Sequence, residues 1–564
     1  MEVDVLIAGG GPCGLMLANE LGRRGIRCLL VDSKPGTAFN PQANATQART
    51  MEHFRRHGFA QEVRAQGLPP DHPTDIAYFT RYSGHKLARL RLPTAAQAVE
   101  RIRQLDGSWS AAELPHRISQ KFVEGILRRH AEAFPSNDIR YGWKLTRFED
   151  TGAAVLATVQ RVDHGEEQWV TARFMVGADG PRSMVRQALR IEWVGASGVR
   201  REFMGGKMFA VYLRAPGFYR AFPHDRAWMY VSVNARRRAF MAAVDGVSEF
   251  AFHAAIHDGE DADAWTAADA QRIFNEAMGT EVPIEVLSTG TWLAGHSLVA
   301  QRFQRGRVFI AGDAAHLFTP TGGLGYNTAV EDAVNLGWKL ASVVRGGAPV
   351  ALLDSYELER KPVAERNTGF ARHFADSVGL FSASPLLEEE SDAGAAERER
   401  AGLHLNAHVR LEFNIPGVTF GARYDASAIV VGDGRAPPPD AANTYVPSAC
   451  PGGRPPHAWL ADGRSLYDTF SFEWTLLQLG PDVPDAGNFV DAARELCLDL
   501  AVVAHRSPEL LALYEKPLVL IRPDQIVAWR GDGAANAARV LARVTGRAGL
   551  APERDGASPA IPVT

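Results

Sequence analysis

The chain has 564 residues, of which 46% are apolar and 22% charged, and its net charge at pH 7 is −4. This length exceeds a single hydrophobic core and predicts two to four domains. The small net charge excludes a general attraction to nucleic acid or to an anionic membrane, and no apolar run approaches the roughly 20 residues of a membrane-spanning helix.

The four cysteines (Cys13, Cys28, Cys450 and Cys497) are too scattered for a disulfide framework, a redox pair or a metal site. Free cysteines are typical of a reducing compartment. We therefore expect a cytoplasmic protein that holds no metal.

The N-terminal segment predicts a strand, a tight turn, a helix and a second strand over residues 3–8, 9–14, 15–24 and 26–31. The turn carries the GxGxxG pattern and an acid ends the second strand: Gly9, Gly11, Gly14 and Asp32. In such a unit a pyrophosphate approaches the glycine backbone at the helix N-terminus, and the carboxylate accepts hydrogen bonds from a ribose. GxGxxG alone is weak evidence, but the complete unit indicates dinucleotide binding.

Residues 40–58 alternate polar side chains with alanines, including Gln42 and Asn44, before a helix expected from Gln47. This alternation fits a segment that lies against a ligand, although an ordinary loop is the more frequent explanation. Farther on, Arg117 and Gln120 lead into another helix. They either reach an anionic cofactor or lie on the surface.

Residues 139–177 read as strands and lead to Asp179-Gly180, a second acid at the end of a strand. The β-type stretches 208–213, 227–233 and 238–244, followed by a helix-rich piece over 248–278, predict an inserted sheet-plus-helix domain that covers a site. The cluster Arg236 to Arg238 is expected at a solvated hairpin tip.

The stretch 307–340 is the most informative one. Its apolar run, 308–311, predicts a buried strand that ends at Gly312-Asp313. A glycine-rich loop with Pro320 follows, and Asn327 is expected to cap the next helix. The N-terminus of that helix, with free N–H groups and the positive end of the dipole, would face the same place as Asp313.

The remaining chain is expected to form a helical region over 352–374, interrupted at Pro362, and a charged linker or exposed helix over 385–402. From about residue 421 the composition changes. A βαβ…ββα order, with a hairpin at 517–530 and a helix at 534–545, predicts a small separate α/β domain.

The three strand-terminal sites, in this order, resemble those of the single-component flavoprotein monooxygenases that hydroxylate aromatic rings, the group of para-hydroxybenzoate hydroxylase and phenol hydroxylase. The resemblance covers residues 1–375. The C-terminal part resembles the thioredoxin-like domain of the phenol hydroxylase branch, through PGGRPPHAWL and VLIRPDQIVAWRG, but it lacks a CxxC pair.

The resemblance implies an α/β fold in four parts. These are a Rossmann-like FAD-binding domain over 1–72, 116–195 and 290–375, an inserted substrate-binding sheet domain over 73–115 and 196–289, a linker or helical part over 376–420, and a thioredoxin-like domain over 421–564. It also implies FAD contacts from Gly9, Gly11, Gly14, Asp32, Ser33, Gln42, Arg117, Gln120, Asp179, Gly180, Gly312, Asp313, Gly323, Leu324, Gly325, Tyr326 and Asn327. NADPH or NADH would bind transiently, because no second GxGxxG is present.

The implied activity is hydroxylation of a phenolic ring by a C4a-hydroperoxyflavin formed from NAD(P)H and O2. The carbonyl of Pro320 is expected to face the substrate. Asn44 stands where many relatives carry a histidine or an aspartate that takes the substrate's proton, and an amide cannot act as a base. Either Tyr230 or His224 on the covering sheet replaces that base, or the substrate arrives ionised.

Other interpretations stay open. The same chemistry on a polyketide or an antibiotic is the main alternative, and a flavin reductase, a halogenase-like enzyme or a non-enzymatic flavoprotein are remote ones. Relatives with this third domain are often dimers, so a homodimer is expected, without nucleic-acid or membrane partners.

Overall fold

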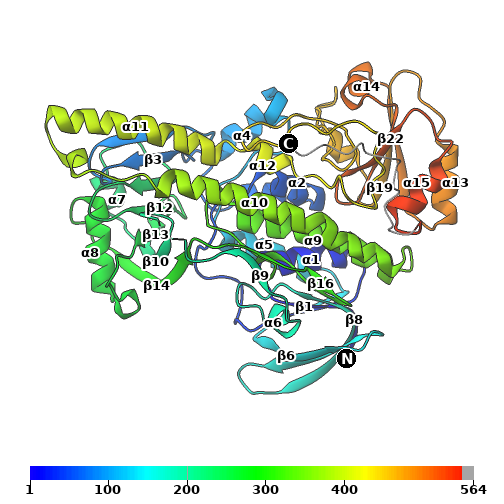
Figure 1. The fold of residues 1–564 in the computed structure, drawn as a ribbon, viewed down its shortest axis with the longest axis horizontal. Coiled ribbons are helices and arrows are strands. Elements are labelled where there is room, and N and C mark those ends of the chain that lie inside the picture. The colour runs from blue at the N-terminus through cyan, green and yellow to red at the C-terminus, as the bar shows by residue number, and fades with distance from the viewer. Residues whose placement is uncertain (200, 549–564) are drawn as a thin grey trace, which may run out of the picture.

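The computed structural model describes residues 1–199 and 201–548 (Figure 1). The end of the expected C-terminal domain, 549–564, lies outside the described residues. In Figure 1 one sheet and its helices occupy the centre, a second sheet lies at one end with helices α7 and α8 on its outer side, and the C-terminal elements lie at the other end. No helix among the described residues is long and apolar enough to cross a membrane.

The central sheet has the order β16-β17-β8-β1-β2-β5, with the hairpin β6-β7 attached to β8. Its strands are β1 (Glu2–Ala8), β2 (Cys28–Asp32), β5 (Asn137–Tyr141), β6 (Trp143–Asp150), β7 (Val155–Arg161), β8 (Glu167–Gly177), β16 (Gln304–Arg305) and β17 (Val308–Ile310). Because β17, β8, β1, β2 and β5 run parallel, their carboxyl ends meet at one edge. That edge is where a parallel α/β sheet binds its ligand.

Three helices cover one face of this sheet: α1 (Pro12–Arg23), α5 (Gln120–Glu132) and α9 (Leu324–Val344). Their apolar residues join those of the strands in one core. Helices α2 (Ala48–His57) and α3 (Ala60–Arg64) lie beside them, and Gly58 ends α2 in the left-handed conformation. The helix expected from Gln47 is confirmed.

The inserted sheet has the order β14-β10-β13-β12-β11-β3-β4. Its strands are β3 (Ile76–Phe79), β4 (Lys86–Leu90), β10 (Gly206–Arg214), β11 (Met229–Ser232), β12 (Ala239–Ala243), β13 (Glu249–Ala255) and β14 (Glu285–Ala294). The helices of this part are α4 (Ala95–Arg101), α7 (Phe218–Ala221) and α8 (Ala267–Met278). Part of the helix-rich prediction over 248–278 is wrong, since residues 249–255 pair as a strand and only α8 is a long helix.

The arginine cluster lies at the tip of the β11-β12 hairpin as predicted, but most of it is not solvated. Only Arg236 is exposed, whereas Arg237 and Arg238 are buried. Arg237 pairs with Glu260 at 2.6 Å, and Arg238 donates to two carbonyls at the end of α10. These interactions explain why charged side chains are tolerated inside the domain.

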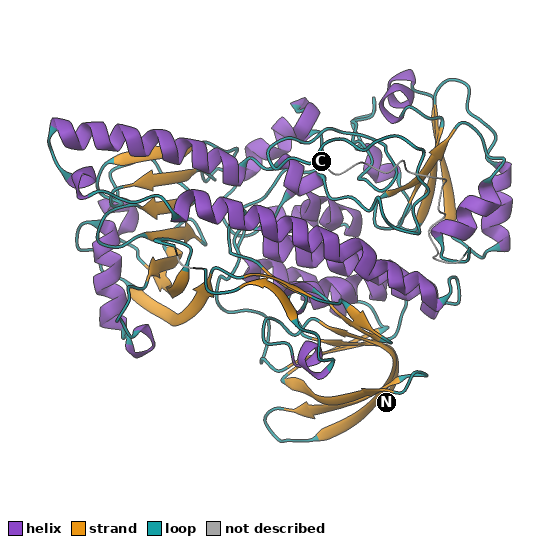
Figure 2. Cartoon of the chain, viewed as in Figure 1, coloured by secondary structure: helices purple, strands orange, loops and turns teal. Residues whose placement is uncertain are grey.

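Two long helices join the parts (Figure 2). Helix α10 (Ser355–Gly379) continues through Pro362, so the expected interruption is wrong. Of the two alternatives predicted for 385–402, the helix is confirmed as α11 (Asp392–Phe413), although it is not fully exposed, because it buries Ala401, Leu405 and Val409 against the inserted sheet. A small sheet, β18-β15-β9, links the parts through His316–Leu317, Ser297–Ala300 and Trp193–Ala196.

The C-terminal sheet has the order β20-β19-β21-β22, with β19 and β20 parallel and the other pairs antiparallel. Its elements are β19 (Trp474–Leu479), α13 (Gly487–Glu495), β20 (Leu500–His505), α14 (Pro508–Tyr514), β21 (Leu518–Ile521), β22 (Val527–Gly531) and α15 (Ala537–Val544). The predicted βαβ…ββα order is confirmed. A buried ion pair, Arg522 to Glu359 at 2.6 Å, fixes this part to α10.

Candidate active site

Gly9 and Gly14 of the first turn are required by close packing. A Cβ on Gly14 would lie 1.9 Å from the carbonyl oxygen of Gly9, and one on Gly9 would lie 2.1 Å from that of Ala178. A Cβ on Gly11, by contrast, would meet nothing within 4 Å. No side chain caps α1 at this end. The turn therefore leaves free N–H groups and open space where a pyrophosphate can approach.

Two of the predicted acids are engaged with the backbone around them. Asp32 accepts hydrogen bonds from the N–H groups of Gly10 at 2.7 Å and Lys34 at 2.8 Å. Asp179 accepts from the Ser183 hydroxyl at 2.5 Å and from Val185 N–H at 3.1 Å, at the start of α6 (Met184–Ala188). Burial raises the pKa of Asp179. Ser33 is exposed and Gly180 adopts φ +80° beside Asp179.

Asp313 lies at the end of β17 with an exposed side chain, although the surrounding protein raises its pKa by desolvation. No group in the described part of the chain donates a hydrogen bond to it, which leaves its oxygens for a ligand's hydroxyl groups. The neighbouring Gly312, at φ +60°, donates its N–H to Asp332 at 3.1 Å. Asp332 also binds His316 and Arg360, both at 2.7 Å.

Asp332 was not predicted from the sequence. It lies on the buried face of α9, where a carboxylate is unexpected. A carboxylate at an apolar position of the predicted helix was the feature of the sequence that could have indicated its role. Burial alone would raise its pKa, but the charges of His316 and Arg360 outweigh burial and hold the pKa below its ordinary value. Asp332 therefore fixes the backbone that presents Asp313.

The glycine-rich loop ends in two left-handed residues, Gly322 at φ +63° and Gly323 at φ +66°. Helix α9 starts directly after them, so the predicted start at Asn327 is wrong: Gly323 is the N-cap. Asn327 lies in the first turn instead. Its amide donates to the carbonyls of Ala45 and Gly323, and its oxygen accepts from Gln47 N–H at 2.8 Å. This ties the start of α9 to the segment before α2.

The other residues predicted to bind the cofactor, and Pro320, which was predicted to face the substrate, differ in exposure. Leu324 is buried, Gly325 and Tyr326 are half-buried, and Gln42 and Pro320 are exposed. Gln120 donates its backbone N–H to the Ala43 carbonyl at 2.6 Å and its side-chain amide to Glu124 at 2.6 Å. The structure thus brings Gln120 and residues 323–327 together around segment 43–47.

Two predicted residues are not brought to this place. Tyr230 is fully buried, its hydroxyl accepts a hydrogen bond from Ala227 N–H, and its ring packs on Phe218 of α7. His224 stacks on Phe79 and bonds the Gly84 carbonyl. Both lie on the face of the inserted sheet that carries α7 and α8, turned away from the FAD-binding domain. This geometry argues against either residue as the substrate's base.

The opposite face of the inserted sheet confronts segment 39–45. Tyr212 packs on Phe39, and the Ser288 hydroxyl donates to Asn40 at 2.6 Å. Across five strands one row of directly opposite residues runs along this face: Val231, Phe240, His253, Ala210 and Gly290. Neighbouring strands lie about 4.8 Å apart, so the row spans roughly 19 Å.

His253 in this row was missed because the period-two pattern was not extended past residue 248. Its ring stacks on Phe240 at 4.5 Å, and its Nδ1 accepts from the Trp292 indole N–H at 3.0 Å. Burial lowers the pKa of His253 to about 4, so the ring is neutral at pH 7. With Nδ1 as acceptor, the proton sits on Nε2, and no group in the described residues binds that N–H.

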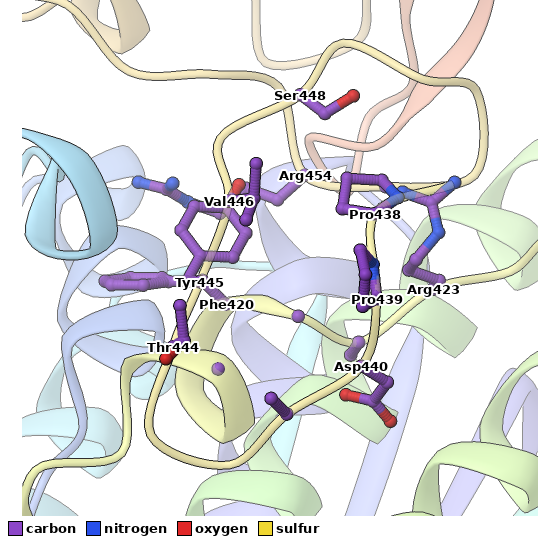
Figure 3. A pocket seen from close by; sticks show the side chains of 15 residues that line it. Phe420, Arg423, Pro438, Pro439, Asp440, Thr444, Tyr445, Val446, Ser448 and Arg454 are labelled. Carbon is purple, nitrogen blue, oxygen red and sulfur yellow. The ribbon is translucent and has the colours of Figure 1, made fainter. Parts of the chain in front are cut away.

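A separate pocket opens between α12 (Pro416–Phe420) and the loop 438–448 (Figure 3). Its charged residues already have protein partners. Arg454 pairs with Glu52 at 2.6 Å, Asp440 with Arg366 at 2.7 Å, and Arg423 with Asp425 at 2.5 Å. The pocket therefore offers no unsatisfied charge to a ligand.

Comparison with known proteins identifies the cofactor. A family model described as "FAD binding domain" matches residues 2–371, and one described as "Aromatic-ring hydroxylase, C-terminal" matches residues 448–548. The uncapped N-terminus of α1, the open space at Gly11 and the free carboxylate of Asp313 fit FAD, and the protein is an FAD-dependent enzyme.

Three similar proteins have related activities. Aklavinone 12-hydroxylase RdmE of Streptomyces purpurascens is 31% identical, with 97% of this chain and 98% of that protein covered. Phenol 2-monooxygenase of a Pseudomonas species is 28% identical, with 94% of this chain and 90% of that protein covered. The rebeccamycin biosynthetic enzyme RebC, solved with reduced flavin, superposes with a TM-score of 0.86 at 33% identity, with 97% and 99% covered.

The matched domains, the relatives and the sheet-edge geometry agree, as the sequence motifs had implied. This chain belongs to the single-component FAD-dependent aromatic-ring hydroxylases, a family of flavoprotein monooxygenases.

Proposed function

We propose that this enzyme uses NADPH or NADH and O2 to hydroxylate a phenolic ring within a multi-ring aromatic molecule of polyketide or antibiotic type. The observation that carries the proposal is the long row on the inner face of the inserted sheet. Small residues, Ala210 and Gly290, continue the surface of the stacked Phe240 and His253 rings. A row of roughly 19 Å is longer than one phenol needs.

Bound FAD supplies hydride acceptance from the nicotinamide and activation of O2. The chain's own residues hold and orient the reactants. Gly9, Gly11, Gly14, Asp32 and Ser33 are proposed to hold the ADP half, with Asp179 and Gly180 beside it. Gly312, Asp313, Gln42 and Gln120 are proposed for the phosphates and sugar chain, and residues 323–327 for the ring system.

The N-terminus of α9 contributes electrostatically. Its free N–H groups and dipole would stabilise negative charge on a bound flavin by about 0.3–1 kcal/mol, and by more where burial excludes water. No side chain caps this helix end, so its N–H donors are left available to a ligand.

The residues proposed to contact the substrate lie on the inner face of the inserted sheet and on the segments opposite it. Asn44 orients a hydroxyl group without accepting its proton. The Pro320 carbonyl and the Nε2–H of His253 supply one acceptor and one donor for ring oxygens. Dry, apolar walls such as Phe240 and Met229 limit the access of water to the reacting ring.

The C-terminal part is proposed to be a thioredoxin-like domain, which its strand order supports. We expect no thiol chemistry from it, because Cys450 is buried and Cys497 is exposed far along the chain. A homodimer also remains a prediction, which light scattering of the purified protein would test.

A substrate panel tests the proposal. NADPH and NADH consumption and hydroxylated product would be measured with phenol, 4-hydroxybenzoate, 1-naphthol and a hydroxyanthraquinone. We expect product from the multi-ring compounds, with weak or uncoupled turnover of single rings. Efficient hydroxylation of phenol alone would contradict the multi-ring proposal, and reduction without any oxygenated product would contradict the hydroxylase function.

A further inference from the structure

The buried guanidinium of Arg117 has no hydrogen-bonded partner among the residues that the structure describes. The Arg117 side chain is 5% exposed, and none of its N–H groups forms a hydrogen bond or an ion pair with the residues that the structure describes. The guanidinium lies 4.5 Å from the centre of the Trp228 ring and 5.7 Å from that of Phe413. An enclosed charge without a hydrogen-bonded partner is costly, so its retention points to a ligand.

The nearest acid does not satisfy this cation. Glu412 attracts Arg117 only at a distance. One of its oxygens accepts from Gly322 N–H at 2.9 Å and the other lies 3.0 Å from His408 Nε2. Burial lowers the pKa of Arg117 to about 10, which still leaves it charged at pH 7.

Arg117 also lies beside the proposed reaction centre. The preceding residue, His116, pairs with Thr46 through hydrogen bonds of 2.8 and 2.9 Å. Ala45, next to Thr46, packs against Gly323 and accepts from Asn327. Trp228 stands immediately before β11 of the inserted sheet, and Phe413 ends α11. The guanidinium is thus enclosed where the glycine loop, the inserted sheet and α11 meet.

The surroundings define what can bind there. A planar guanidinium packed against two aromatic rings can still offer its edge N–H groups to a planar anion, in the fork geometry that matches a carboxylate. Asn44 cannot take a proton from the substrate, so a ligand that is already ionised needs a positive partner in the protein. The pocket of Figure 3 differs, because its charges are all paired.

On the basis of the proposed function, we propose that Arg117 binds a carboxylate of the substrate, so that the enzyme selects aromatic molecules that carry this acidic group. This assigns Arg117 to the substrate rather than to the phosphates or sugar chain of FAD. The pairing of an arginine with an anion in a dry site is strong and geometrically specific.

The test compares a matched pair of probes, 1-hydroxy-2-naphthoate and 1-naphthol, which differ in one carboxylate. Dissociation constants would be measured from the perturbation of flavin absorbance in the wild type, Arg117→Lys and Arg117→Met. A charged hydrogen bond contributes about 1.5–3 kcal/mol, so we expect the wild type to prefer the acid by roughly 10- to 100-fold. Arg117→Met should remove this preference, leave the binding of 1-naphthol within about threefold and retain FAD. Arg117→Lys should keep part of the preference.

Three results would overturn the proposal. These are no preference for the acid in the wild type, an unchanged preference in Arg117→Met, and flavin-free Arg117 variants that fold normally, which would assign the guanidinium to FAD. The proposed hydroxylase function is tested separately, because oxygenated product from wild-type enzyme does not depend on which probe binds more tightly.

Discussion

Replacing Asp332 by asparagine probes how the fold presents the flavin-binding carboxylate of Asp313. Asp332 is fully buried and accepts hydrogen bonds from His316, Arg360 and the N–H of Gly312. Asparagine has the same shape but turns an NH2 group toward at least one of these donors. Breaking a buried pair from one side costs about 3–5 kcal/mol, since the remaining charge is left uncompensated.

The expected shift in melting temperature follows from the size of the domain. An unfolding entropy of about 2.1 cal/mol/K per residue over roughly 370 residues gives ~0.8 kcal/mol/K. The cost of about 3–5 kcal/mol then lowers the melting temperature by about 4–6 °C. Thermal unfolding followed by flavin fluorescence measures this shift, and the same samples report the bound FAD per protein, which should fall.

A neighbouring residue supplies the control. Glu331 also pairs with Arg360, at 3.1 Å, but its side chain is 18% exposed. Glu331→Gln should cost less than about 1 kcal/mol, because water screens such pairs. Equal melting temperatures for Glu331→Gln and Asp332→Asn, or an Asp332→Asn protein that matches the wild type, would refute the reasoning.

The effect of Asp332→Asn should depend on pH in a defined direction. The folded-state pKa of Asp332 is depressed, so its carboxylate contributes its full stability above the unfolded value, about 3.9. That contribution is lost as the pH falls through the folded-state pKa. The difference in the free energy of unfolding between Asp332→Asn and the wild type should therefore be constant from pH 7 to about pH 5, and it should become smaller only below about pH 4.

Three further predictions use other parts of the site. Gly14→Ala should misfold or lose stability, because its Cβ would lie 1.9 Å from the Gly9 oxygen. Gly11→Ala should have the melting temperature of the wild-type apoprotein yet fail to retain FAD. Equal melting temperatures of the two variant apoproteins would contradict this. Asp313→Ala should lose FAD while the apoprotein stays as stable as the wild-type apoprotein, since no described group forms a hydrogen bond with the carboxylate. Normal flavin absorbance after gel filtration would contradict the assignment of Asp313 to FAD binding. His253→Phe should keep the ring stack on Phe240 but remove both the acceptor for Trp292 and the Nε2–H donor. We expect kcat/KM for multi-ring phenols to fall by about tenfold while FAD is retained. An unchanged kcat/KM would show that His253 is not part of the site.

The cofactor half of this enzyme is encoded locally, which is why the sequence predicted it. Strand, glycine turn, helix and acid follow one another within residues 3–32, and the Gly312-Asp313 unit is as short. Parallel strands place such units at one edge of a sheet whatever lies between them. Even here, two local predictions were wrong. Two consecutive left-handed glycines start α9 before Asn327, and α10 continues through Pro362 at the cost of one helix hydrogen bond, on a turn where Leu358 is exposed.

The substrate side was decided by tertiary structure. A shift of one residue in a strand moves every side chain to the other face, so only the register shows that Tyr230 points to α7 and His253 to the FAD-binding domain. The buried face of α11 carries few large apolar residues and could not be separated from a charged linker by composition. The sequence alone thus determined that a dinucleotide is bound and by which units. The packing of the inserted sheet and α11 onto the FAD-binding domain determined which side chains meet the substrate, because those contacts join residues hundreds of positions apart.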